Sequence, residues 1–213
     1  MNPVIEVIEV TKKFKDTIVL DQVNLSVERG SICGLTGGNG SGKTVLMKVI
    51  CGFIIPDSGL VYVQEKQIGK DCDFPENTGI IIEVPSFSPF LSGFKNLKNL
   101  ASIQKIIDDD TVRQTMRLVG LDSTNKKWVS KYSLGMRQRL GIAQAIMENQ
   151  EVLILDEPMN GLDKQGVEDI RNLLLRMKSE GKTILLASHN SQDVDVLCDK
   201  VYQMEYGKIT QIK

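Results

Sequence analysis

The 213-residue sequence lacks long apolar runs, a leader-like start and an excess of either charge. No apolar run approaches the roughly 18 residues that a membrane-spanning helix requires, and segments such as 152–155 have the length of strands. The first ten residues carry Glu6 and Glu9 without a basic start, which is unlike a secretory signal peptide. Because 26 basic residues nearly balance 27 acidic ones, we expect no bulk attraction to nucleic acid or anionic lipid.

Cysteine and histidine are also scarce. Cys33, Cys51, Cys72 and Cys198 show no spacing typical of disulfides or zinc sites, so they are interpreted as reduced thiols of a cytosolic protein, used as small core residues. His189 is the only histidine. The 41% hydrophobic and 25% charged residues are ordinary for a folded protein, and we expect a single domain over residues 1–213.

Short apolar strands alternate with amphipathic helices, which predicts an α/β fold on a mostly parallel sheet, with an antiparallel β part at the N-terminus. Strands are expected at 4–10, 23–27, 31–36, 60–63, 79–83, 152–155 and 183–187, with a C-terminal hairpin at 201–205 and 209–212. Residues 64–79 are expected to form a loop. From about 88 to 147 helical periodicity dominates, including one helix that extends to Ile107, so we expect an inserted helical subdomain there.

The segment Gly37-Gly38-Asn39-Gly40-Ser41-Gly42-Lys43-Thr44 matches the phosphate-binding loop pattern G-x4-G-K-[ST], between a predicted strand and a predicted helix. Its four glycines let backbone N–H groups wrap a triphosphate, and the helix start adds positive potential. We expect Lys43 to contact the outer phosphates and Thr44 to ligate Mg²⁺. An incidental glycine-rich turn is the alternative interpretation.

A second motif is the apolar strand 152–155 followed directly by Asp156 and Glu157. Ligands bind at the carboxyl ends of strands in open parallel sheets. We therefore expect Asp156 to hold Mg²⁺ through water and Glu157 to polarise the attacking water. Alone, such a stretch also fits a solvated turn, but together with the phosphate loop it indicates nucleotide chemistry.

The segment Tyr132-Ser133-Leu134-Gly135-Met136-Arg137-Gln138-Arg139 narrows the choice among phosphate-loop proteins. Here the sequence resembles the ATP-binding cassette (ABC) family, and the resemblance covers essentially the whole chain. Ser133 and Gly135 match the family signature L-S-G-G-Q, whereas Leu134, Tyr132 and Met136 depart from it. The resemblance implies that Ser133 and Gly135 contact the γ-phosphate of ATP bound to a second subunit. Taken alone, Ser133 also fits a plain helix cap.

The same resemblance implies roles for four further residues. Asp163 matches the loop that crosses the family's dimer interface, and His189 matches the histidine that contacts the γ-phosphate. Phe14 matches the aromatic that stacks on adenine. A structural histidine and a core aromatic are the alternatives for these two. Glu83 stands where the family usually has glutamine, and it would add a charged Mg²⁺ ligand that repels the triphosphate if metal were absent.

As a family member, the chain would bind ATP and Mg²⁺, hydrolyse ATP and close as an ATP-sandwiched homodimer. It would drive a separate integral-membrane subunit from the cytoplasmic face of the membrane, without a nucleic-acid partner. Glu83 and the segment from Pro85 to Leu97 are similar to bacteriocin and lantibiotic export or immunity cassettes, which implies export of a peptide or drug-like substrate. Phe87, Phe90 and Leu91 are candidate contacts to the membrane subunit, or else a buried loop core.

The sequence is also compatible with two other classes of protein. One is a soluble cassette ATPase that acts on nucleic acid, the ribosome or a cofactor-assembly complex instead of a transporter. The other is a phosphate-loop kinase, which transfers phosphate to a second substrate instead of water.

Overall fold

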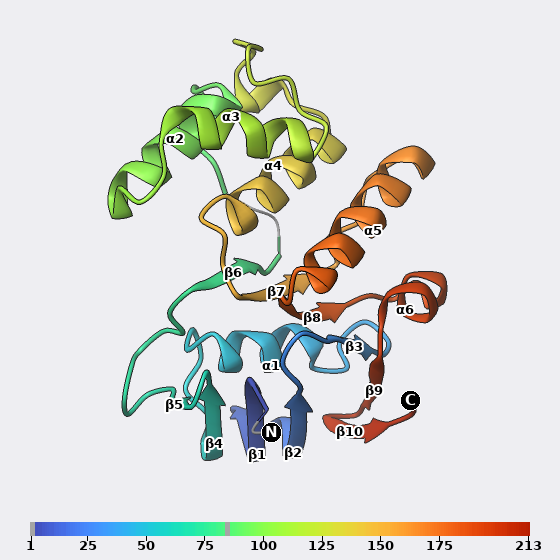
Figure 1. Ribbon diagram of the computed structural model, residues 1–213. Coiled ribbons are helices and arrows are strands. Elements are labelled where there is room, and N and C mark those ends of the chain that lie inside the picture. Colours follow the sequence, from blue (N-terminus) through green and yellow to red (C-terminus); the bar gives the residue numbers. More distant parts are fainter. Residues whose placement is uncertain (1–2, 84–85) are drawn as a thin grey trace.

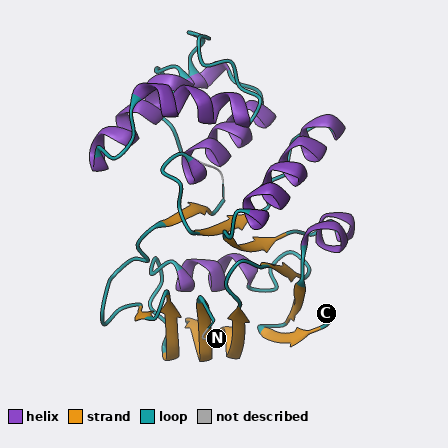
Figure 2. Cartoon of the chain, in the orientation of Figure 1, coloured by secondary structure: helices purple, strands orange, loops and turns teal. Residues whose placement is uncertain are grey.

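The computed structural model describes residues 3–83 and 86–213. Two β-sheets and a set of helices make up an α/β fold, with a mostly parallel sheet and a separate antiparallel sheet (Figures 1 and 2). The fold class predicted from the sequence is confirmed.

The antiparallel sheet has the strand order β2-β1-β4-β5. Its strands are β1 (Ile5–Phe14), β2 (Thr17–Val27), β4 (Ser58–Val63) and β5 (Lys66–Gln67). The expectation that residues 64–79 form only a loop is wrong at β5. Gln64 and Glu65 both adopt positive φ, which makes the tight two-residue turn that returns the chain along β4.

The second sheet has the strand order β10-β9-β3-β8-β7-β6, in which only β10 runs antiparallel to its neighbour. Its strands are β3 (Ile32–Thr36), β6 (Thr78–Ile81), β7 (Val152–Asp156), β8 (Thr183–Ala187), β9 (Lys200–Glu205) and β10 (Lys208–Gln211). Because β3, β6, β7 and β8 are parallel, their carboxyl ends meet at one edge. The predicted strand to residue 83 ends earlier, at Ile81, because Glu83 adopts a positive φ of 62° that no longer fits the ladder.

Helices separate and cover the two sheets. They are α1 (Lys43–Ile50), α2 (Gly93–Gln104), α3 (Asp109–Leu118), α4 (Leu134–Ile146), α5 (Lys164–Ser179) and α6 (Ser191–Leu197), with a 3₁₀ turn at Val129–Lys131. Helix α1 lies between the two sheets (Figure 1). The helix expected to reach Ile107 stops at Gln104, because Lys105 adopts the left-handed conformation that ends it.

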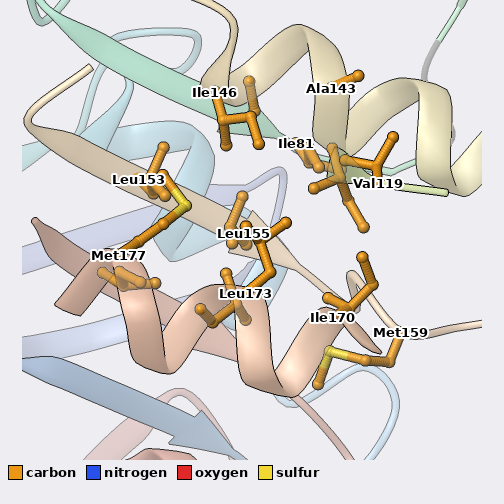
Figure 3. Close-up of a cluster of buried hydrophobic side chains, with 14 of the residues drawn as sticks. Ile81, Val119, Ala143, Ile146, Leu153, Leu155, Met159, Ile170, Leu173 and Met177 are labelled. Atoms are coloured by element: carbon orange, nitrogen blue, oxygen red, sulfur yellow. The ribbon is translucent and has the colours of Figure 1, made fainter. Parts of the chain in front are cut away.

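Two apolar cores result from this layering. One joins the antiparallel sheet, α1 and one face of the parallel sheet. The other lies on the opposite face, where Leu153 and Leu155 of β7 meet Ile170 and Leu173 of α5 and side chains of α4 (Figure 3). Helices α2, α3 and α4 contact one another and lie apart from the antiparallel sheet (Figure 1). The inserted subdomain over 88–147 of a single domain stays a prediction.

None of the helices in the described part of the chain combines the length and apolar character needed to cross a lipid bilayer.

Candidate nucleotide-binding site

A cavity of about 480 Å³ lies where the carboxyl ends of the central strands meet the start of α1. The cavity is lined by residues 39–44 of the phosphate loop, together with Glu83, Asp156 and Glu157. The structure therefore brings together the two motifs that lie more than 100 positions apart in the sequence. The other residues that line the cavity are Val19, Val45, Leu134, Gln138 and Asn160.

Glycine is required at both ends of the phosphate loop. Gly37 and Gly42 have φ values of 143° and 110°, and a Cβ at Gly37 would lie 2.2 Å from the Met204 carbonyl oxygen. In contrast, an added Cβ at Gly38 or Gly40 meets no described atom within 4 Å, so the loop faces open space there. The fixed ends and open middle form a cradle of backbone N–H groups, which suits a bound phosphate.

The phosphate loop has two buried polar groups of its own, the Lys43 ammonium and the Ser41 hydroxyl. Lys43 Nζ donates to the Gly37 and Gly38 carbonyl oxygens, at 2.7 and 3.0 Å, which places its charge beneath the cradle. Ser41 Oγ is buried without a hydrogen-bond partner among the described residues. A buried hydroxyl of this kind ordinarily finds a partner, so its orphaned state fits a ligand oxygen in the cradle.

Two of the three residues expected to hold Mg²⁺, Thr44 and Asp156, lie side by side. Thr44 Oγ1 donates to Asp156 Oδ2 at 2.7 Å, and Asp156 is buried at the end of β7. In residues 3–83 and 86–213, no three His, Cys, Asp or Glu side chains are arranged to hold a metal ion. One hydroxyl and one carboxylate fit Mg²⁺, which usually completes its shell with waters and substrate phosphates.

Glu157 and His189 are paired at the ends of neighbouring strands. The Glu157 N–H donates to the Ala187 carbonyl at 3.0 Å, and Gln138 Nε2 donates to the Glu157 carbonyl at 3.2 Å. These contacts hold Glu157 at a φ of 49°, with its Oε2 2.8 Å from His189 Nδ1. A carboxylate held in this way can orient the imidazole or accept a proton from water in the cavity.

A buried ion pair supports the segment that carries His189. Arg171 Nε of α5 donates to Asp193 Oδ1 of α6 at 2.9 Å, and Ser188 Oγ donates to Asp193 Oδ2 at 3.1 Å. The Asn190 N–H in turn donates to Ser188 Oγ at 3.1 Å. Ser188 and Asn190, the residues on both sides of His189, are therefore held in place by the contact between α5 and α6.

The signature residues serve as structural contacts within the chain. Ser133 Oγ caps α4 by accepting from the Met136 N–H at 3.2 Å, and Asp163 Oδ1 caps α5 by accepting from the Gly166 N–H at 2.9 Å. A Cβ at Gly135 would lie 2.9 Å from the Gly161 carbonyl oxygen, so the first turn of α4 packs closely against the loop that contains Gly161. Ser133, Gly135 and Asp163, all within the described part of the chain, do not line the cavity.

Phe14 also lies outside the lining of the cavity, although it is described. It is 45% exposed at the end of β1, with Lys12 Nζ 5.6 Å from its ring centroid, so the alternative of a core aromatic is wrong. Glu83 lies at the cavity and accepts a hydrogen bond from Lys48 Nζ at 2.6 Å.

The residues expected to contact a membrane subunit differ in their exposure. Pro85, at the start of the segment that contains them, lies outside the described residues. Phe87 packs against the apolar core that includes α2, α3 and α4. Phe90 is exposed, and its ring lies edge-on to that of Trp128, with 5.9 Å between the ring centroids.

Five of the residues that line the cavity were not predicted as site residues. Val45, Leu134, Gln138 and Asn160 fall inside or beside recognised motifs, so their positions carried a signal that was not used. Val19 lies in β2, far from every motif, and only the packing of the two sheets on α1 brings it to the cavity.

A phosphate loop lies between the parallel strand β3 and helix α1, and Asp156 comes to it from β7, two strands away in the same sheet. This arrangement defines a P-loop nucleoside triphosphatase. Residues 20–160 match the family described as ABC transporter. The chain belongs to the ABC transporter family, as its sequence predicted.

The chain is 44% identical to YybJ of Bacillus subtilis strain 168, an uncharacterized ABC transporter ATP-binding protein, across 96% of this chain and 94% of YybJ. It is 38% identical to the bacitracin transport ATP-binding protein BcrA of Enterococcus faecalis, across 99% of this chain and 69% of BcrA. The lantibiotic transport ATP-binding protein SrtF of Streptococcus pyogenes is 34% identical, across 93% of this chain and 85% of SrtF.

The fold matches that of solved cassettes. The dimeric structure of the bacterial ABC transporter cassette MJ0796 superposes with a TM-score of 0.87 at 22% identity, covering 98% of this chain and 99% of that one. As a member of the ABC transporter family, the chain is an ATP-binding, ATP-hydrolysing subunit of an ABC transporter that uses ATP and Mg²⁺, which confirms the predicted activity and cofactors.

Proposed function

We propose that two copies of this chain close around ATP and drive a separate integral-membrane subunit that exports a peptide or drug-like compound. The observation that carries this proposal is the incomplete cavity. It holds the phosphate loop and the two carboxylates, whereas Ser133 and Gly135 of the same chain do not line it. A second copy would supply these two residues to the γ-phosphate, so closure would depend on ATP.

Within the cavity, different residues of the chain would have different roles in hydrolysis. The backbone of residues 37–44 and Lys43 would bind the phosphates, and Thr44, Asp156 and Glu83 would hold Mg²⁺. Mg²⁺ supplies charge neutralisation to the phosphates when bound. Glu157 would accept the proton of the attacking water, and His189, held by Glu157, would contact the γ-phosphate. Phe14 would stack on adenine, and Asp163 would lie at the dimer interface.

The kind of cargo is inferred from relatives. BcrA is named for bacitracin transport and SrtF for lantibiotic transport, and both names describe peptide antibiotics. Their similarity over most of the chain supports export of a peptide or related drug-like compound. The chain would then lie at the cytoplasmic face of the membrane through its partner, and its balanced charge gives no reason to propose nucleic acid as a partner.

Trapping the closed state tests the proposed dimer. In Glu157→Gln the carboxylate that would accept the proton is replaced while the cavity keeps its shape, so ATP should bind and not be hydrolysed. Size-exclusion chromatography with light scattering should show a dimer with ATP and a monomer with ADP. The double variant Lys43→Ala/Glu157→Gln should stay monomeric. A Glu157→Gln protein that is monomeric at saturating ATP would contradict the proposal.

A further inference from the structure

Glu83 projects a carboxylate toward the nucleotide cavity from an unusual backbone position. It follows β6 with a φ of 62°, outside the strand ladder, and its side chain is 63% exposed. Its Oε1 accepts a hydrogen bond from Lys48 Nζ at 2.6 Å. Lys48 lies on α1, four residues after Thr44, so the helix that begins at the phosphate loop also carries the cation that holds Glu83.

The charges around the cavity explain why such a cation matters. The lining residues include three carboxylates, Glu83, Asp156 and Glu157, but only one ammonium group, that of Lys43. A triphosphate is itself strongly anionic, so this lining would repel it wherever the carboxylates are not compensated. Asp156 accepts from the Thr44 hydroxyl and Glu157 pairs with His189. Glu83 has the ion pair with Lys48.

We propose that Lys48 is a positioning residue that holds the Glu83 carboxylate at the edge of the cavity and offsets its charge toward ATP. Lys48 does not itself line the cavity within the described part of the chain, so it acts through Glu83. This inference rests on the proposed use of the cavity as the ATP site. It assigns a function to the pair in binding rather than in folding, because ion pairs this exposed contribute little to stability.

A double-mutant cycle on nucleotide affinity tests the inference. The Kd for ATP is measured by titration calorimetry on the full-length chain, in excess EDTA and again at saturating Mg²⁺, for the wild type, Lys48→Met, Glu83→Gln and the double variant. In EDTA, Lys48→Met should raise Kd about three- to tenfold, because the Glu83 charge is then uncompensated. On the Glu83→Gln background the same change should alter Kd less than about twofold. Saturating Mg²⁺ should reduce both effects, and Lys48→Arg should retain the wild-type Kd.

A second lysine–glutamate pair serves as the matched control. Lys66 Nζ and Glu76 Oε2 lie 2.8 Å apart, with both side chains exposed and neither lining the cavity. Lys66→Met should leave the Kd for ATP unchanged in EDTA and in Mg²⁺.

Three outcomes would overturn the inference. They are no change in Kd for Lys48→Met, an equal loss of affinity with and without Glu83, and an equal loss for Lys66→Met. An equal loss on both backgrounds would assign Lys48 a direct effect on ATP. A wild-type chain that does not bind ATP, or a Lys43→Ala chain that binds it normally, would instead overturn the assignment of the cavity, so the two failures are distinguishable.

Discussion

Burial controls the chemistry of individual cysteine side chains. Cys33, Cys51 and Cys198 are buried in the cores, and this desolvation raises the pKa of each thiol to about 12. Cys72 is half-buried in the segment between β5 and β6. The interpretation of the cysteines as small core residues is confirmed for three of the four.

We expect Cys72 alone to react quickly with a chromogenic disulfide reagent at pH 8. At that pH, thiols with a pKa near 12 are almost fully protonated, and the thiolate is the reactive form. Absorbance should therefore report one fast thiol in the native protein and four after unfolding in guanidinium. Cys72→Ser should remove the fast phase, and a native protein with three or four fast thiols would contradict the burial of the others.

At the scale of elements, the contact between α5 and α6 determines where the His189 segment lies. Arg171 and Asp193 are both buried, and they join the two helices directly. Ser188 donates to the same carboxylate, so the end of β8 is tied to this pair. Breaking the pair should disturb folding and the His189 segment together.

Arg171→Met should lower the free energy of unfolding by about 3–5 kcal/mol, because it leaves Asp193 buried and unpaired. Urea denaturation measures this loss. The matched control is Arg176→Gln on the same helix, which removes an exposed pair with Glu180 at 3.8 Å and should cost less than about 1 kcal/mol. The double variant Arg171→Met/Asp193→Leu should recover most of the stability, since no buried charge is left. An equal loss of unfolding free energy for Arg171→Met and Arg176→Gln would show that the buried pair stabilises the fold no more than the exposed pair does.

At the scale of the whole molecule, a second cavity lies between the edge strand β6 and helices α2 and α4. It measures about 1000 Å³, and Ile80, Leu100, Ile103 and Ile106 contribute apolar surface to it. Ile103 and Ile106 are both more than half exposed. Apolar side chains gathered around a groove suit a partner protein, and under the proposed function the membrane subunit would be that partner.

An affinity-tagged chain isolated from detergent-solubilised membranes of its own host should carry an integral-membrane protein with it. Ile103→Asp/Ile106→Asp should reduce that recovery at least about fivefold, because charged side chains would be buried in the contact. Both positions lie outside the nucleotide cavity, so the Kd for ATP should not change. Mass spectrometry of the eluate measures the recovery. Isolation with ribosomes or nucleic acid, and without a membrane protein, would favour the soluble cassette ATPase.

Local sequence patterns were sufficient to predict the phosphate loop and the two acidic residues Asp156 and Glu157. A glycine pattern before a helix and an apolar strand before two acids are each specified by residues adjacent in the chain. Parallel strands then bring their carboxyl ends to one edge, so the meeting of the two motifs could also be predicted. The signature, Asp163 and His189 depended on family resemblance, because a serine, an aspartate or a histidine alone has no specific local signal.

Sequence alone determined the class of protein and its family, and it predicted the phosphate-loop residues and carboxylates that line the cavity, since these depend on short motifs and strand order. Only the tertiary structure decided which charges compensate one another. Lys48 meets Glu83 35 positions away, and Arg171 meets Asp193 across two helices. Electrostatic pairing depends on distance in space rather than separation along the chain, and these distances are set by the packing of α1, α5 and α6 on one sheet.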